Sequence, residues 1–275
     1  MIVKVRRMLR NVVFLRSVSH FCRALGQRVR HKRKKALEDL QNLMQEREDP
    51  WNYATNPEEA DRFRSAAELL DMAGENEPFE NAFEVGCSEG VFTAMLAPRC
   101  KSLLAVDISQ VALCRAQKRC TGQGVRFELW NLFDSPAPLN LDLVVVMDVI
   151  EYFFYPQDVR FARDKLVRAL RPGGYLLVGN SRQSEVFETS WWGKWMLRGG
   201  KRIAEFFGDH PRLEFVAWET KGIYVNALFR LRAKMADPFS AQRGSDESIA
   251  KDGVSLGSNA LNRSGFAEVR MREKA

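Results

Sequence analysis

The chain has 275 residues, of which 42 are Lys or Arg and 35 are Asp or Glu, so its formal net charge is +7. Residues 1–36 hold twelve basic residues and no acid, which leaves 30 basic and 35 acidic residues in the rest. This mildly acidic remainder disfavours a polyanion such as nucleic acid as the main ligand. The five scattered cysteines lack metal-ligand spacing, so we expect no metal site and reduced thiols in a cytoplasmic protein.

The N-terminal arm, which we place at residues 1–48, carries apolar residues at three- and four-residue steps with arginines beside them. Its longest apolar run, residues 12–15, is far shorter than the ~20 residues that a membrane-spanning helix needs. One interpretation is a basic amphipathic helix lying on the anionic inner face of the membrane. The alternatives are a helix docked on the main domain or on a partner, and an RNA-binding arm.

Two short apolar strands follow the probable helix 58–72. The first ends in the glycine turn Gly86–Gly90, which leads into a helix at residues 91–96, and the second ends on Asp107. Because adjacent parallel strands of a doubly wound sheet open into the same crevice, one ligand can touch Gly86 and Asp107 together. The missing Cβ of Gly86 would leave the ligand's path open, and Asp107 could accept from two ribose hydroxyls. The pattern is typical of a nucleoside-binding half-site, the alternative being a turn that binds nothing.

The turn also indicates which nucleoside to expect. It lacks the third glycine of a dinucleotide-binding fingerprint, and Glu89 would place a negative charge against a pyrophosphate. No Gly-Lys-Ser/Thr sequence of a phosphate-binding loop occurs in the chain. S-adenosylmethionine has a ribose and an adenine but no phosphate, so we expect S-adenosyl-L-methionine as the cofactor.

Further strands are predicted at 125–130, 141–147 and 175–178, with a crossover helix at 161–170 and a closing hairpin of 215–218 and 223–231. The apolar run at 141–147 is typical of a strand that is buried on both faces of a parallel sheet. Strands alternating with helices indicate βαβ units. We therefore expect an α/β fold: a Rossmann-like seven-stranded, mostly parallel sheet with helices on both faces and an antiparallel final strand. The domain would span residues 49–232, and residues 233–275 read as a disordered polar tail.

These features, in this order, resemble a Rossmann-like (class I) S-adenosylmethionine-dependent methyltransferase. The matching segments are Glu84–Gly90, Val106–Asp107, Asn131, Asp142–Asp148 and Leu170–Gly174. Within that class the chain resembles the nodulation-type N-methyltransferases, which methylate the amino-sugar end of a chitooligosaccharide. This finer resemblance rests on Glu84–Cys87, Phe92–Thr93, Leu96–Pro98, Val178–Arg182, Trp192–Gly193 and the upstream residues Asp49–Thr55.

The resemblance implies roles for individual residues. The glycines would let the methionine part lie against the strand end, Asp107 would hold the ribose, and Asn131 would accept from the adenine amino group. Ile108 and Trp130 would flank the adenine, although Trp130 could equally be a core aromatic. The cofactor-binding residues that we expect are Glu84, Gly86, Cys87, Gly90, Asp107, Ile108, Asn131 and Asp148.

Methyl transfer from a sulfonium depends mainly on in-line positioning, so little covalent help from the protein is needed. An amine must be neutral when it attacks, and a hydroxyl would gain more from a general base. The candidate catalytic residues are Asp148, Glu151 and Tyr152, which follow the fourth strand. His210 is a further candidate, but a lone histidine in a loop is more often exposed than catalytic.

The acceptor that we expect is an amine or hydroxyl of a small molecule, possible examples being an amino sugar or another saccharide intermediate. Residues 49–56, the helix 58–72 and an insertion at 183–201 with Trp191, Trp192 and Trp195 would cover the crevice. The Asn/Asp-Pro-Pro-Tyr motif of enzymes that methylate base amines is absent. An RNA methyltransferase that uses the basic arm and a non-catalytic cofactor-binding partner protein remain as alternative functions.

Overall fold

The computed structural model describes residues 34, 35, 38–74, 77–153, 155–181, 199–222 and 224–233. Most of the basic arm, the three tryptophans of the insertion and the tail beyond residue 233 lie outside this part of the chain, so the interpretations placed on them stay predictions. None of the described helices is long and apolar enough to cross a membrane.

A helical stretch at residues 38–46 precedes a regular alternation of strands and helices. The bounds in chain order are α2 Pro57–Ala73, β1 Phe79–Val85, α3 Val91–Leu96, η1 Ala97–Arg99, β2 Cys100–Asp107, α4 Gln110–Arg119, β3 Val125–Leu129, β4 Leu141–Met147, η2 Ile150–Tyr152, α5 Pro156–Ala169, β5 Leu170–Ser181, α6 Gly200–Gly208, β6 Leu213–Lys221 and β7 Tyr224–Leu231.

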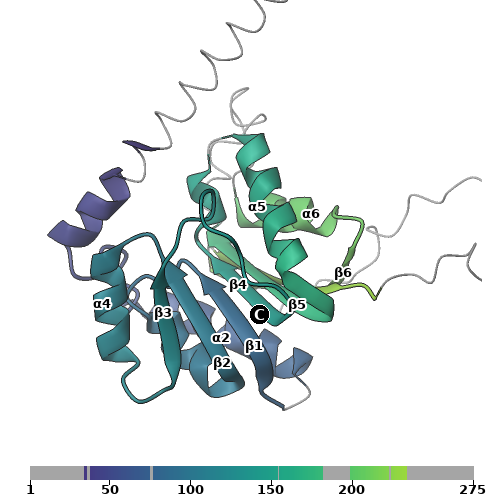
Figure 1. The fold of residues 1–275 in the computed structure, drawn as a ribbon, viewed down its shortest axis with the longest axis horizontal. Coiled ribbons are helices and arrows are strands. Elements are labelled where there is room, and N and C mark those ends of the chain that lie inside the picture. Colours follow the sequence, from purple (N-terminus) through teal and green to yellow (C-terminus); the bar gives the residue numbers. More distant parts are fainter. Residues whose placement is uncertain are drawn as a thin grey trace, which may run out of the picture. The chain divides into compact units, whose positions relative to one another are not determined.

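The strands form one seven-stranded sheet in the order β3-β2-β1-β4-β5-β7-β6, and Figure 1 shows β3, β2, β1, β4 and β5 in this succession. β1 to β5 run parallel, and β7 is antiparallel to both β5 and β6. The predicted fold class is therefore confirmed. The strand order reverses between β1 and β4, and ligands of such sheets bind outside the carboxyl ends of the strands at this point.

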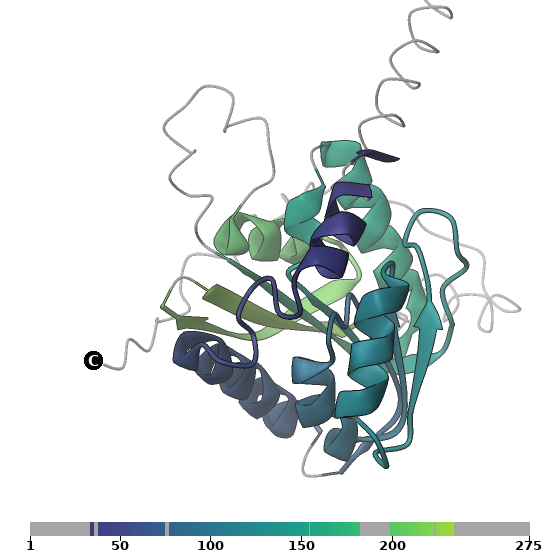
Figure 2. The ribbon, with the colours of Figure 1, turned by 90° about the vertical axis from the view of Figure 1, so that its left-hand side faces the viewer.

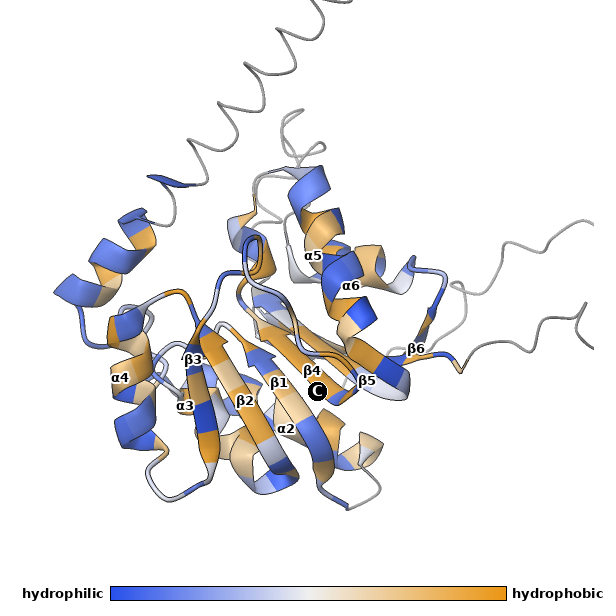
Figure 3. Ribbon diagram, viewed as in Figure 1, coloured by the Kyte–Doolittle hydropathy of each residue, from blue (hydrophilic) through white to orange (hydrophobic). Residues whose placement is uncertain are grey.

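Alternating side chains of the strands bury the two faces of the sheet under different helices. On β4, Val144 and Val146 belong to the core that contains α5 and α6, whereas Leu143 and Val145 belong to the core that contains α2 and α3. Figure 2 shows the sheet between α2 and α6. In Figure 3 the strands are mainly apolar, and polar residues lie on the outer sides of the helices. This two-faced burial explains why β4 is apolar apart from Asp142.

The structure corrects the start of one predicted helix and adds helices that were not predicted, α4 among them. α5 begins at Pro156, five residues before the predicted start, because proline fits the first turn of a helix, where its missing N–H is not needed. α4 was not predicted at all, although its N-cap was readable in the sequence: the Ser109 hydroxyl accepts a hydrogen bond from the backbone N–H of Ala112. The sequence did not show that α4 packs against the sheet through residues such as Leu113.

Candidate active site

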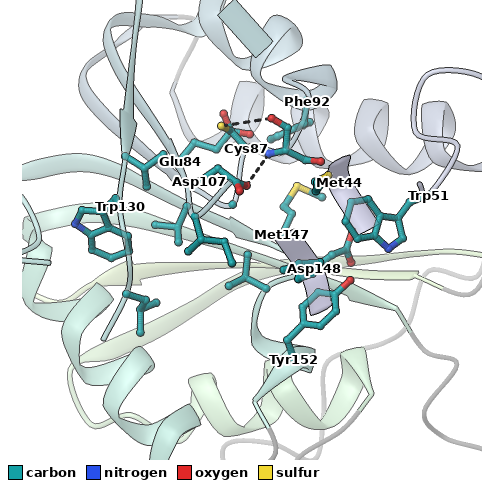
Figure 4. Close-up of a pocket in the computed structure, with 18 of the residues that line it drawn as sticks. Met44, Trp51, Glu84, Cys87, Phe92, Asp107, Trp130, Met147, Asp148 and Tyr152 are labelled. Carbon is teal, nitrogen blue, oxygen red and sulfur yellow. Dashed lines mark hydrogen bonds between the residues drawn. The ribbon is translucent and has the colours of Figure 1, made fainter. Parts of the chain in front are cut away.

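A pocket lies at the carboxyl ends of β1, β2 and β4, where the strand order reverses. In Figure 4, Glu84, Cys87 and Asp107 gather on one side of it, and Trp51, Asp148 and Tyr152 lie on the other. Nearly all residues predicted for the site line this pocket: Glu84, Gly86, Cys87, Asp107, Ile108, Asn131, Asp148 and Tyr152. Gly90 and Glu151 are not among the lining residues.

The glycine turn is left-handed at both glycines, which favours residues without a Cβ. A Cβ on Gly86 would come within 2.3 Å of the Val149 side chain, and one on Gly90 within 2.9 Å of the Ala116 Cβ on α4. A Cβ at Gly86 would therefore collide with the protein as well as enter the path expected for the ligand. The missing Cβ of Gly90, just before α3, allows close packing against α4.

Asp107 is held at the end of β2 by backbone hydrogen bonds. Its Oδ2 accepts from the N–H of Ser88 at 3.0 Å, and its Oδ1 accepts from the N–H of Ser109 at 2.9 Å. Burial raises the pKa of Asp107, and these two hydrogen bonds oppose the rise. Each carboxylate oxygen has a second lone pair, so Asp107 can still accept from a vicinal pair of hydroxyls.

Glu84 brings a buried carboxyl to the same side of the pocket. Its side chain is 4% exposed, and its Oε2 has no hydrogen-bond partner. Burial raises the pKa of Glu84 from 4.5 to about 7. An unsatisfied carboxyl oxygen in a pocket wall suits a donor from a ligand, such as an α-amino group.

The raised pKa of Glu84 makes the stability of the ligand-free protein depend on pH. The unfolded chain ionises this carboxyl near pH 4.5 and the folded chain near pH 7, so the contribution of Glu84 to stability is largest below pH 4.5 and is lost as the pH rises through 7. Glu84→Gln removes this loss. We expect its advantage over the parent protein to grow from near zero below pH 4.5 to about 3 kcal/mol above pH 7. Urea unfolding across this range measures the difference, with Glu80→Gln, at an exposed position of the same strand, as control. A difference independent of pH would contradict the prediction.

Trp130 and Asn131, which we expected near the adenine, both line the pocket. Trp130 is 7% exposed, packs edge-on against Phe83 with ring centroids 5.3 Å apart, and donates from Nε1 to the carbonyl of Pro136. The indole is therefore a core aromatic that also lines the pocket. The Asn131 Oδ1 accepts from the N–H of Phe133 at 3.0 Å, so the amide shapes this turn and keeps one lone pair for a ligand.

Asp148 follows β4 in a left-handed backbone conformation, φ 53°, which is uncommon for a residue with a side chain. Its Oδ2 accepts from the Arg62 guanidinium at 2.5 Å and from the Tyr53 hydroxyl at 3.4 Å. The other oxygen, Oδ1, is buried without a hydrogen-bond partner. Burial raises the pKa of Asp148, and the guanidinium of Arg62 opposes this rise.

The other catalytic candidates are placed less favourably. Tyr152 is 39% exposed at the pocket, and burial followed by the charge of Glu151 raises its pKa, so at neutral pH the phenol can donate but not act as a base. His210 lies just before β6, whose first residue, Leu213, pairs with Leu231 at the end of β7. Because β7 is antiparallel to β5, this places His210 at the amino-terminal ends of the parallel strands, whereas the pocket lies at their carboxyl ends.

Sequence reasoning missed part of the site that comes from the N-terminal side. Met44, in the helical stretch 38–46, is 2% exposed and lines the pocket, and Gln41 donates to the carbonyl of Ile108 at 3.1 Å. Residues 38–48 of the predicted arm thus contact the domain. Trp51 and Tyr53 line the pocket, as expected of the segment 49–56. Arg62 was not foreseen, although an arginine on the apolar face of a predicted helix was a readable signal.

The pocket fits S-adenosylmethionine on several observations. Gly86 lines the pocket without a side chain, and Asp107 keeps two free acceptor lone pairs. The Glu84 Oε2 has no hydrogen-bond partner and can accept from a ligand. The rest of the wall is largely apolar and aromatic, which suits an adenine. Within the described part of the chain, no group of three or more His, Cys, Asp and Glu is placed to hold a metal ion.

The sheet order and this pocket define a class I S-adenosylmethionine-dependent methyltransferase fold. A family model described as "Nodulation protein S (NodS)" matches residues 34–212, and the chain belongs to this family. Nodulation protein S of Rhizobium tropici is 33% identical over 138 residues, or 50% of this chain and 57% of that protein. The homologue from Sinorhizobium fredii is 31% identical over 49% of this chain and 61% of its own length. The chain thus aligns with about three fifths of these relatives.

A solved structure agrees with these matches. The N-methyltransferase NodS from Bradyrhizobium japonicum WM9, in complex with S-adenosyl-L-homocysteine, superposes with a TM-score of 0.59 at 28% identity. The superposition covers 70% of this chain and 97% of the NodS chain. A second structure of that enzyme covers 65% of this chain and 98% of its own, with a TM-score of 0.54 and 26% identity.

Proposed function

We propose that this protein transfers a methyl group from S-adenosylmethionine to an amine nitrogen of a small molecule, with an amino sugar as the preferred acceptor. The observation that carries the proposal is Asp148, whose side chain is 11% exposed in the pocket wall and whose carboxylate oxygen Oδ1 is buried without a partner. An amine can fill that deficit with an N–H donor. The similarity to solved N-methyltransferases supports nitrogen over oxygen as the nucleophile.

In this proposal the chain binds the acceptor and removes a proton. The ammonium form of the amine gives one proton to Asp148 and thereby gains a free lone pair. When bound, S-adenosylmethionine supplies an electrophilic methyl carbon, so the new N–C bond forms while the C–S bond breaks and its electron pair goes to sulfur. Burial favours Asp148 as a proton acceptor because it raises the pKa of this carboxyl.

Aromatic side chains support a sugar as the carrier of the amine. The rings of Trp51 and Tyr53 stack with centroids 5.6 Å apart and an interplanar angle of 19°, and both residues line the pocket. A flat aromatic surface suits the apolar face of a sugar ring.

We also propose a cytoplasmic location for the protein. The four described cysteines are free thiols, as is usual for proteins of that reducing compartment.

Glucosamine oligomers test the acceptor class directly. We expect the protein to transfer the methyl group of S-adenosylmethionine to these oligomers and not to N-acetylglucosamine oligomers, whose acetylated nitrogen is not nucleophilic. Methylation should be followed by mass spectrometry, which also locates the methyl group. Methylation of a hydroxyl in both oligomer series would contradict the assignment to nitrogen.

Asp148→Asn tests the proposed role of the carboxylate. We expect kcat/KM for the amine to fall by roughly 10²–10⁴-fold, because asparagine cannot accept the proton. The affinity for S-adenosylhomocysteine, measured by calorimetry, should change much less. Glu128→Gln is the control, because Glu128 is a half-exposed carboxylate on β3 that is not among the residues lining the pocket. Full activity of Asp148→Asn would remove the carboxylate from the reaction.

A further inference from the structure

Arg62 is a buried arginine at the centre of a charged cluster that joins α2 to the end of β4. Its side chain is 0% exposed. Nη1 lies 2.5 Å from the Asp148 Oδ2, and Nη2 and Nε lie 2.6 and 2.9 Å from the Glu59 Oε2. One guanidinium therefore serves two carboxylates, one of which belongs to the proposed acceptor site.

The surroundings of Arg62 fix the direction of its guanidinium. The guanidinium carbon lies 4.3 Å from the ring centroid of Phe63 and 4.4 Å from that of Tyr224 on β7. The Tyr224 hydroxyl donates to the Glu59 Oε1, and the Arg62 carbonyl accepts from the Asn226 Nδ2 at 3.1 Å. A planar cation held between two rings and two carboxylates has little freedom to reorient.

The cluster has an excess of negative charge. With Glu59 and Asp148 ionised, two buried carboxylates face a single guanidinium, and the Asp148 Oδ1 has no donor. A buried anion without a full set of partners is costly, and a cation or a strong donor at the free oxygen relieves that cost. The titratable side chains around Asp148 are Tyr53, Glu59, Arg62, Tyr152 and Tyr224.

We propose that Arg62 is a positioning residue, which holds Asp148 as an oriented anion, and that the acceptor completes this cluster as an ammonium ion at Oδ1. Burial favours the protonated form of Asp148, which cannot accept a proton, and the Arg62 guanidinium favours the anion. Because the guanidinium donates only to Oδ2, it leaves Oδ1 for the substrate. The inference rests on the proposed role of Asp148 in acceptor binding.

Two substitutions with opposite expected signs test the role of Arg62. In Arg62→Met the lost cation should raise the titration midpoint of Asp148 by about one pH unit or more, a tenfold change in its ionisation constant. In Glu59→Gln the lost anion should lower that midpoint. Arg62→Lys keeps the charge and should move it less than Arg62→Met does. Arg64→Met, which removes an exposed arginine from the same helix, should not move it.

The primary readout is the carbon-13 NMR titration of the Asp148 carboxyl in the cofactor-free protein, assigned with Asp148→Asn. The acidic limb of the pH profile of kcat/KM should shift in the same direction as the NMR midpoint. An unmoved midpoint in Arg62→Met overturns the inference. If that variant does not fold, an unmoved midpoint in Glu59→Gln overturns it instead, because a cluster acting on Asp148 must respond to either charge.

The titration separates this inference from the proposed function. If glucosamine oligomers are not methylated but the midpoint moves as expected, the control of Asp148 by Arg62 stands and the acceptor assignment fails. If the oligomers are methylated and the midpoint stays fixed in a folded variant, Arg62 only fastens α2 to the sheet. Adding glucosamine oligomers to the cofactor-free protein should lower the midpoint, because a bound ammonium ion stabilises the anion. No change at saturating oligomer would exclude the ammonium form.

Discussion

Replacing Asp107 with alanine is expected to weaken the binding of S-adenosylhomocysteine by about 2–4 kcal/mol, a loss of roughly 30- to 1,000-fold in affinity. Asp107 lines the pocket, and after its hydrogen bonds from Ser88 and Ser109 each carboxylate oxygen keeps a lone pair for a ribose hydroxyl. The substitution removes both acceptors from a buried position. Isothermal titration calorimetry of the purified variant measures the effect directly.

The controls separate loss of the ribose contacts from damage to the glycine turn. Asp107→Asn keeps the shape of the side chain and one acceptor oxygen, so its affinity should lie between those of the parent and the alanine variant. Glu128→Ala removes a carboxylate from β3 that is 50% exposed and should leave affinity unchanged. If Asp107→Ala unfolds like the parent and binds with unchanged affinity, Asp107 does not hold the cofactor.

Arg62→Met is expected to lower the free energy of unfolding by about 3–5 kcal/mol, the largest stability loss that we predict for a single residue. The methionine side chain fills much of the same space but leaves two buried carboxylates, Glu59 and Asp148, without their cation. The rings of Phe63 and Tyr224 would also lose the charge that they flank. Urea unfolding at neutral pH measures the loss.

The matched control is two residues away on the same helix. Arg64 pairs with Asp61, but both side chains are 60% exposed, so Arg64→Met should change stability by no more than about 0.5 kcal/mol. Neutralising the partner should recover part of the loss: Glu59→Gln combined with Arg62→Met leaves only one uncompensated carboxylate. Equal effects of Arg62→Met and Arg64→Met would show that the buried cluster contributes nothing to folding.

The cofactor side of the site was predictable because its residues come from consecutive strand ends. The glycine turn after β1 and the acid that ends β2 are set by local sequence, and parallel pairing necessarily brings them to one edge. The roles of single residues were less readable. Gly90 was expected at the ligand, and the structure shows that a Cβ there would meet Ala116, because a missing Cβ can serve a ligand or a neighbouring helix with the same sequence signal.

The acceptor side was less predictable for a physical reason. Asp148 was selected because it directly follows the fourth strand, and the structure places it in the pocket wall. Its guanidinium partner lies 86 positions away, on the buried face of a helix that we had only expected to cover the crevice. A residue's pairing partners over such a separation depend on how the elements pack, and a single sequence does not record this packing.

By itself, the amino-acid sequence determined the α/β class, the parallel sheet and a phosphate-free nucleoside site, because apolar periodicity, turn glycines and strand-end acids act over a few neighbouring residues. Only the tertiary structure decided that Arg62 meets Asp148, that Trp130 packs in the core, and that His210 lies at the opposite edge of the sheet. These facts depend on strand order, on strand direction and on the face that each helix buries. They are properties of the whole folded domain, because they depend on packing between residues that lie far apart in the sequence.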